Sequence, residues 1–247
     1  MMPDEVKKYW DDSNAESMYD KNLVEIESDA ILEHLKESDR VIDIGCGEGE
    51  STIKYLKKVK ELIALDYSMT RLEKLKDKND QIITLQMDMR ELSFDTIKKK
   101  FTKAITQRSL INLNNFDEQK AVIKGIHSIL VDDGKYIMLE GFTEGVETIN
   151  KIRSYFKLQA IEVKWHNLFL NKKELLEHIR PYFRLEYTRD FSLYFFITRV
   201  FNAILKSPEI PNWNDPVNNL AKTMEISYKN DFIRGISRLE LLVFKKC

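Results

Sequence analysis

Short apolar runs alternate with longer segments of helical periodicity along most of the chain. The strand-like runs lie within residues 41–49, 61–68, 82–92, 101–113 and 135–140. Helical spacing marks residues 50–56, 69–75 and 117–130, and a turn is expected at 132–134. Further strands are expected at 184–191 and 237–245. Strands separated by helices predict a parallel sheet with right-handed crossovers.

The first apolar run ends in an acid and opens into a glycine loop. Gly45, Gly47 and Gly49 stand at alternate positions, where the missing Cβ atoms permit positive φ and close approach of a ligand. An amphipathic helical segment, residues 50–56, follows directly. This arrangement is typical of the adenosine-cofactor end of a Rossmann-like sheet.

The charge of this loop narrows the choice of ligand. The dinucleotide fingerprint G-x-G-x-x-G requires glycine at position 50, where this chain has Glu50. Asp43, Glu48 and Glu50 would also repel a pyrophosphate, which depends on backbone N–H groups and the helix dipole. S-adenosylmethionine carries a sulfonium and an ammonium and no phosphate. The loop therefore favours S-adenosylmethionine over a nicotinamide or flavin dinucleotide.

This segment resembles motif I of the class I S-adenosylmethionine-dependent methyltransferases, (Asp/Glu)-x-Gly-x-Gly-x-Gly, although an ordinary strand-to-helix turn would look similar. Asp43, Gly45, Gly47 and Gly49 match the motif. The resemblance covers residues 40–140 well and is topological beyond them. It implies an α/β fold, a Rossmann-like doubly wound sheet of seven mostly parallel strands. The last strand is expected to be antiparallel, with helices on both faces.

The ends of the next two strands supply further cofactor contacts. Asp66, about twenty residues beyond the glycine loop, is placed to accept hydrogen bonds from a ribose, with Tyr67 packing on the adenine. The resemblance implies that Asp88 accepts from the adenine amino group and that the N–H of Met89 meets a ring nitrogen. A helix N-cap acid and a surface-loop aspartate are the alternatives for the two aspartates. The other predicted cofactor-binding residues are Cys46 and Gln107.

The fourth strand is followed by Gln107 and Arg108 and by none of three motifs that mark particular methyltransferases. Asn/Asp-Pro-Pro-Tyr, a Pro-Cys nucleophile and the aspartates of magnesium-dependent catechol enzymes are all missing. We therefore expect metal-independent chemistry with no metal site. Arg108 either holds an anionic group of the substrate or forms a structural ion pair.

Three segments lie outside the cofactor-binding core of residues 38–140 within a single domain, 1–247. They are an N-terminal lid, 1–37, and two substrate-cap insertions, 141–181 and 192–236. Tyr9, Trp10 and Tyr19 either cover the cofactor or anchor the lid to the core. The predicted substrate-binding residues are Tyr9, Tyr19, Arg108, Trp165, Asn167, Arg189, Tyr194 and Arg199.

Methyl transfer from a sulfonium is a direct displacement, so an acceptor hydroxyl must lose its proton near the transition state. A histidine of near-neutral pKa suits this task. His166 is the candidate base because the other three histidines fall in helices remote from the expected site. A histidine that only hydrogen-bonds the substrate, or a structural one, is the alternative.

Composition excludes several classes of partner. The 247 residues carry a net charge of −1 and a pI near 6.5, which gives no basic field for nucleic acid. The apolar block 191–205 is too short for a membrane span. Two cysteines, one of them Cys46 in the loop, indicate a reducing and therefore cytoplasmic compartment. We expect a small-molecule substrate and a monomer or homodimer.

The sequence as a whole predicts a methyltransferase that moves a methyl group to a hydroxyl, less favourably an amine, of a small polar metabolite or sugar-type substrate. A catalytically silent S-adenosylmethionine-binding subunit shares the same motifs. An NAD-dependent oxidoreductase is opposed by the acidic loop. A protein or RNA methyltransferase needs an extended or basic docking surface.

Overall fold

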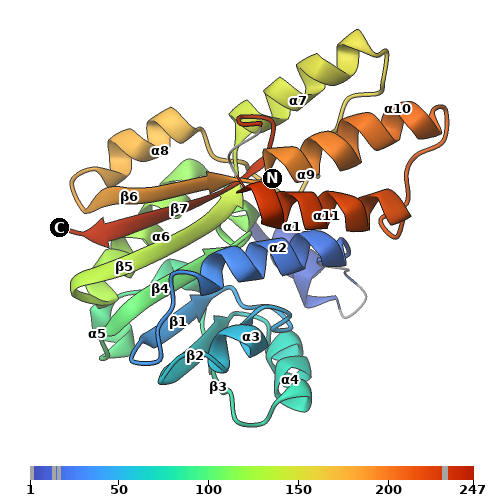
Figure 1. Cartoon of the computed structure of the whole chain (residues 1–247). Helices are drawn as coiled ribbons and strands as arrows, with labels where there is room; N and C mark the ends of the chain where they lie inside the picture. The colour runs from blue at the N-terminus through green and yellow to red at the C-terminus, as the bar shows by residue number, and fades with distance from the viewer. Residues whose placement is uncertain (1–2, 13–14, 16–17, 230–232) are drawn as a thin grey trace.

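A computed structural model describes residues 3–12, 15, 18–229 and 233–247 (Figure 1). Parts of two predicted cap segments lie outside the described residues. They are residues 1–2, 13–14 and 16–17 of the N-terminal lid and 230–232 of the second insertion.

Within the described residues, one sheet of seven strands in the order β3-β2-β1-β4-β5-β7-β6 forms the centre of the fold. The strands are β1 Arg40–Ile44, β2 Glu61–Asp66, β3 Ile83–Gln86, β4 Phe101–Gln107, β5 Leu130–Gly141, β6 Phe183–Asp190 and β7 Leu239–Lys246. The pairs among β1 to β5 are parallel, and β7 runs antiparallel to both of its neighbours. The predicted doubly wound sheet with an antiparallel last strand is confirmed.

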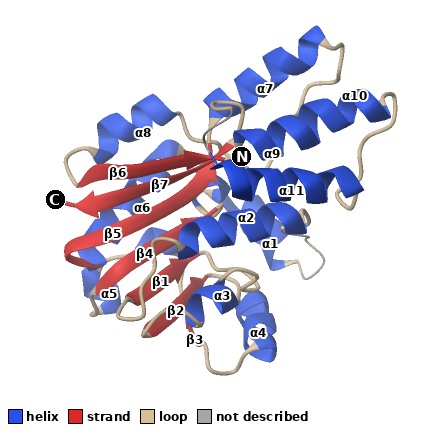
Figure 2. Cartoon of the chain, in the orientation of Figure 1, coloured by secondary structure: helices blue, strands red, loops and turns tan. Residues whose placement is uncertain are grey.

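Helices cover both faces of the sheet (Figure 2). They are α1 Pro3–Asp11, α2 Lys21–Leu32, α3 Thr52–Leu56, α4 Met69–Lys78, α5 Phe94–Ile97, α6 Phe116–Ile129, α7 Thr143–Tyr155, α8 Lys172–Ile179, α9 Ser192–Phe196, α10 Asn202–Lys206 and α11 Pro216–Tyr228. A π-helical segment, Ile197–Phe201, joins α9 to α10, and two 3₁₀ turns follow β3 and β4 at Met89–Glu91 and Leu110–Asn112.

Alternating strand positions divide the core between the two faces, as the period of two in a strand requires. On β5, Ile137 and Leu139 pack with the helices α2, α3 and α11. Tyr136 and Met138 of the same strand pack with α6 and α8 on the opposite face. The strands therefore read as continuous apolar runs because both of their faces are buried.

The turn expected at residues 132–134 is instead an irregular part of β5. Phe101 of β4 pairs with Leu130, whereas Lys103 pairs with Lys135, so the register shifts between these pairs. Asp133 takes a positive φ of 61° within this stretch. The extra residues bulge out of the ladder without ending the strand, so β5 begins at Leu130 rather than at Lys135.

The two insertions extend the molecule beyond the carboxyl ends of the parallel strands. Figure 1 shows α7, α10 and α11 projecting on this side, while α1 lies near the same edge. In the part of the chain that is described, no helix is long and apolar enough to cross a membrane. The segments around this edge enclose the candidate site.

Candidate functional site

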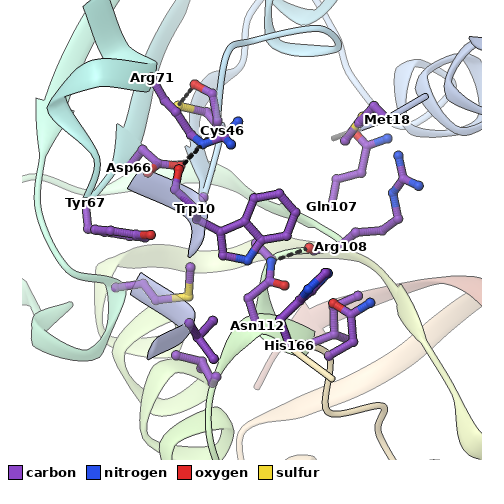
Figure 3. Close-up of a pocket in the computed structure, with 18 of the residues that line it drawn as sticks. Trp10, Met18, Cys46, Asp66, Tyr67, Arg71, Gln107, Arg108, Asn112 and His166 are labelled. Carbon is purple, nitrogen blue, oxygen red and sulfur yellow. Dashed lines mark hydrogen bonds between the residues drawn. The ribbon is translucent and has the colours of Figure 1, made fainter. Parts of the chain in front are cut away.

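A cavity of about 190 Å³ lies at the carboxyl ends of the parallel strands. Its walls come from α1, from the loops after β1, β2, β3 and β4, from the first insertion and from the start of β7. This is the edge of an open α/β sheet at which ligands bind. Figure 3 shows the Trp10 indole in this cavity, with Asp66 and Tyr67 on one side and Arg108, Asn112 and His166 on the other.

The glycine loop forms the floor of the cavity. All three of its glycines have positive φ, 75° at Gly45, 54° at Gly47 and 74° at Gly49. The N–H groups of Gly45 and Cys46 donate to the carbonyl of Leu65, which fixes the loop against β2. Gly47 lines the cavity, whereas Gly49 faces the α4 side chain Leu75. The two glycines therefore serve different purposes, a ligand surface and helix packing.

Two of the three loop acids are neutralised by lysine and arginine side chains. Glu48 lies 3.3 Å from Nη1 of Arg71 and 2.9 Å from Nζ of Lys74, and Glu50 lies 2.9 Å from Nζ of Lys78. The prediction that these glutamates make the loop strongly acidic is wrong, because cations from α4 offset them. What remains to attract a cation is a pair of buried aspartates.

Asp43 and Asp66 are both almost fully buried and both line the cavity. Asp43 accepts a hydrogen bond from Thr52 Oγ1 (2.7 Å), and burial raises its pKa to about 6. Asp66 accepts from the backbone N–H groups of Gly47 (2.8 Å) and Ser68 (3.0 Å), and burial raises its pKa. Each carboxylate keeps acceptor capacity for a ligand. The predicted positions of both aspartates in the site are therefore supported by the geometry.

Asp88 lines the cavity as predicted, but its oxygens are already engaged. Arg90 donates to it from the backbone N–H, Nε and Nη2, and Lys7 Nζ lies 2.5 Å from Oδ2. Burial raises the pKa of Asp88, but these partners outweigh burial and hold it well below its ordinary range. A carboxylate offers roughly four acceptor positions, so an adenine amino group can bind here only if Lys7 moves away.

Helix α1 closes the cavity through Trp10 rather than Tyr9. Trp10 lines the cavity, and its carbonyl accepts a hydrogen bond from Arg71 Nε (2.6 Å). Tyr9 stands outside the cavity and stacks on the far side of His166, with ring centroids 4.4 Å apart and an interplanar angle of 20°. Trp165 is half exposed and meets the Tyr9 ring edge-on. Tyr9 and Trp165 are therefore supports of the site and not cavity residues.

Tyr67 and Tyr19, also predicted site residues, both line the cavity. Tyr67 donates its hydroxyl hydrogen to the carbonyl of Lys7 (2.9 Å), which links the β2 loop to α1. Cys46 and Met89 line the same end. Burial, with smaller effects of the neighbouring aspartates, raises the pKa of the Cys46 thiol, so it stays protonated and is no nucleophile.

His166 and Asn167 lie in the first insertion at the opposite end of the cavity. His166 is 5% exposed, and its Nδ1 has no hydrogen-bond partner among the described residues. Burial, with a smaller contribution from Lys164, lowers its pKa to about 4. The near-neutral pKa expected for this histidine is wrong, and the imidazole is uncharged at pH 7.

The polar pair that ends β4 joins the cavity to the buried interior. Gln107 donates from Nε2 to Glu27 (2.7 Å) and accepts at Oε1 from the Tyr55 hydroxyl (2.8 Å). Arg108 lies beside the same glutamate, with Nε 3.4 Å from Oε2, so its predicted structural ion pair is present. Burial raises the pKa of Glu27. Both Gln107 and Arg108 also line the cavity, as predicted.

Three predicted substrate residues are placed elsewhere. Arg189 is buried with its guanidinium 3.7 Å from Glu225, and it does not line the cavity. Tyr194 donates its hydroxyl hydrogen to Asp20 (2.7 Å), and Arg199 donates to the other oxygen of the same aspartate (2.6 Å). The substrate-binding assignments of Arg189, Tyr194 and Arg199 are wrong for this cavity because buried acids hold all three side chains.

Sequence reasoning missed several residues that line the cavity, among them Lys7, Arg71, Asn112, Asn114 and Arg238. One detectable signal was helical phase. Val6 and Trp10 are four residues apart on α1 and share the face that covers the site. Arg238 stands in the last predicted strand region, far from every motif, and only the position of β7 beside β5 brings it to the site.

Within the described residues, no group of three or more His, Cys, Asp or Glu side chains could hold a metal ion. Metal independence stays a prediction. The acceptor capacity at Asp43 and Asp66, by contrast, fits the ribose and the positive end of an S-adenosyl cofactor.

Comparison with known proteins identifies the domain. Residues 41–134 match the family described as a methyltransferase domain. A carboxy-S-adenosyl-L-methionine synthase of a Nitratiruptor species is 24% identical over 190 residues, which are 74% of this chain and 79% of that protein.

Two solved structures share the fold over almost the whole chain. Geranyl diphosphate C-methyltransferase from Streptomyces coelicolor A3(2), with S-adenosyl-L-homocysteine, has a TM-score of 0.63 at 12% identity and covers 99% of this chain and 98% of its own. N-methyltransferase NodS from Bradyrhizobium japonicum WM9, with the same ligand, has a TM-score of 0.59 at 11% identity and covers 99% and 97%. Residues 41–134 therefore carry a methyltransferase domain, and almost the whole chain shares the fold of two methyltransferases whose structures hold S-adenosyl-L-homocysteine.

Proposed function

We propose that the protein transfers the methyl group of S-adenosylmethionine to a hydroxyl, less favourably an amine, of a small polar molecule without a metal ion. One observation carries the proposal. A single cavity runs from the buried aspartates of the cofactor loops to polar side chains outside the cofactor-binding motifs, Asn112, His166 and Asn167. Donor and acceptor can thus meet in one enclosed space, as direct displacement requires.

The cofactor end is assigned to the loops after β1, β2 and β3. We place the ribose at Asp66, whose position about twenty residues beyond the glycine loop suits that contact. Asp43 balances the positive charge of the methionine part. The adenine is assigned to Asp88 and Met89, with Lys7 leaving the carboxylate on binding. S-adenosylmethionine supplies the electrophilic methyl group, and the protein aligns it and excludes water.

The acceptor end is assigned to the first insertion and the β4 loop. We propose that Nδ1 of His166 accepts the proton of the acceptor hydroxyl, since this nitrogen is buried and has no hydrogen-bond partner among the described residues. A pKa of about 4 makes the imidazole a weak base. An anionic acceptor would raise that pKa by favouring the protonated ring. Tyr19, Asn167 and Arg108 are the proposed substrate contacts.

The test is a coupled assay of S-adenosylhomocysteine release with matched pairs of small alcohols and amines. We expect S-adenosylhomocysteine to be released with the alcohols, and to be released more slowly or not at all with the corresponding amines. Release with amines alone would overturn hydroxyl transfer. Tight binding of S-adenosylhomocysteine with no turnover on any member of the panel would favour the silent cofactor-binding subunit instead. Addition of EDTA should leave the rate unchanged, and loss of activity would contradict metal independence.

A further inference from the structure

The acids that line the cavity are confined to one of its ends, where Lys7, Arg71 and Arg90 pair with some of them. All five acids of the described lining lie on β1, β2 or the loops after the first three strands, at the cofactor end; they are Asp43, Glu48, Glu50, Asp66 and Asp88. At the acceptor end the charged lining residues are Arg108, Lys164 and Arg238, and the described lining there contains no acid. This end of the cavity therefore presents positive charge to whatever enters it.

Arg108 is held at this end by an unusual backbone. Its φ is +53°, a left-handed value that is uncommon for a residue other than glycine and is found at functional sites. Its side chain is 19% exposed, and buried Nε and Nη2 make no hydrogen bond in the described structure. Oε2 of Glu27 lies 3.4 Å from Nε of Arg108, and the two groups form an ion pair without a hydrogen bond. Two donors of the guanidinium are therefore buried without a hydrogen-bond acceptor among the described residues.

Arg238 is a second guanidinium in the same wall, just before β7. Its Nε is buried without a hydrogen-bond partner among the described residues, and its guanidinium carbon lies 5.9 Å from the centre of the Phe195 ring. The buried carboxylate of Glu27, which pairs with Arg108, also attracts the charge of Arg238. Burial, and to a smaller degree the nearby Arg199 and Arg108, lower the pKa of Arg238, while Tyr19 raises it through a hydrogen bond.

Buried guanidinium groups with unused donors are costly unless a ligand satisfies them. A planar oxyanion accepts two parallel N–H bonds from an arginine and also relieves repulsion between two of them. We propose that the methyl acceptor is a small acid whose carboxylate or phosphate is held by Arg108 and Arg238. The apolar residues Ile111, Phe169 and Leu239 at this end would contact its body. This inference rests on the proposed function, because it concerns the acceptor of that reaction.

Calorimetry on the full chain saturated with S-adenosylhomocysteine tests the proposal with three probes of similar shape, benzoate, phenyl phosphate and uncharged benzamide. We expect benzoate or phenyl phosphate to bind at least tenfold more tightly than benzamide. The anion that binds more tightly shows whether the acceptor is a carboxylic acid or a phosphate ester. Raising the salt concentration should weaken the binding of the two anions and leave the affinity for benzamide unchanged.

Arg238→Gln should abolish the preference for anions while the affinity for S-adenosylhomocysteine stays within about twofold of wild type. The matched control is Arg184→Gln, which removes an exposed arginine of β6 outside the cavity and should change neither affinity. Arg238→Lys keeps the charge without the planar fork and should retain an intermediate preference.

Equal binding of the three probes, or binding of none of them to the cofactor-loaded protein, would overturn the anionic acceptor. A parallel loss of S-adenosylhomocysteine affinity in Arg238→Gln would overturn it as well, because the arginine would then hold the cofactor's own carboxylate. If Arg238→Gln does not fold, the comparison of probes on the wild type still decides. Failure of S-adenosylhomocysteine to bind the wild type at all is a different result, which defeats the proposed function itself.

Discussion

The two glycines Gly47 and Gly49 offer a matched pair of substitutions that separates ligand binding from folding. Each has a positive φ, so alanine at either position carries a left-handed penalty of roughly 1–2 kcal/mol in the free energy of unfolding. A Cβ on Gly47 meets nothing within 4 Å and enters the cavity. A Cβ on Gly49 would lie 2.0 Å from Cδ1 and 3.1 Å from Cγ of the fully buried Leu75.

The magnitudes follow from these contacts. Gly47→Ala should lower the free energy of unfolding only by the backbone penalty, roughly 1–2 kcal/mol. Gly49→Ala should lower it by about a further 1–3 kcal/mol, because the added methyl group overpacks Leu75, which cannot turn away from all its contacts. For the affinity for S-adenosylhomocysteine, the order of the two variants is reversed, and Gly47→Ala is the more strongly affected. Gly47→Ala should weaken binding at least tenfold, about 1.4 kcal/mol, since its methyl group occupies ligand space.

Urea unfolding and titration calorimetry, carried out on both variants under the same conditions, measure the two quantities. Folded Gly49→Ala should bind S-adenosylhomocysteine nearly as the wild type does. The reasoning is refuted if Gly47→Ala binds with wild-type affinity, or if Gly49→Ala is no less stable than Gly47→Ala.

Three further predictions concern titratable side chains. The affinity for S-adenosylhomocysteine should fall by up to about tenfold between pH 7 and pH 5, because Asp43, with a pKa of about 6, is ionised above that pH and protonated below it. Asp43→Asn should bind weakly at both pH values. An unchanged pH dependence in this variant would assign the effect to another group. Lys7→Met should strengthen binding a few-fold by freeing an oxygen of Asp88, whereas weaker binding in calorimetry would show that Lys7 supports the bound state. His166→Ala should lower kcat about 100-fold at nearly unchanged cofactor affinity, and turnover close to wild type would remove it as the base.

Much of the fold was predictable because strand and helix periodicities are local properties of the sequence. The apolar runs located the strands, and the acids Asp66 and Asp88 that end two of them do reach the cavity. The division into lid, core and cap segments, the oligomeric state and the cytoplasmic location stay predictions. The length of β5 was missed since its bulge at Asp133 resembles a turn in sequence.

The errors at the site share one physical cause, which is that ion pairs form between residues distant in sequence. Glu48 looks like a ligand-facing acid until α4 brings Arg71 and Lys74 to it. Arg199 looks available until Asp20, 179 residues away, accepts its hydrogen bond. A sequence shows the type of each charge but not the partner that satisfies it.

The central claim is that one cavity holds the methyl donor at the end lined by Asp43, Asp66 and Asp88 and the acceptor at the end lined by Arg108 and Arg238. A crystal structure of the protein with S-adenosylhomocysteine tests it most directly. The account predicts the ribose hydroxyls at Asp66, the adenine beside Asp88 with Lys7 displaced, and the sulfur directed toward Arg108 and His166. A ligand bound outside this cavity, or with its adenine at Arg108 and its sulfur directed away from His166, would contradict it.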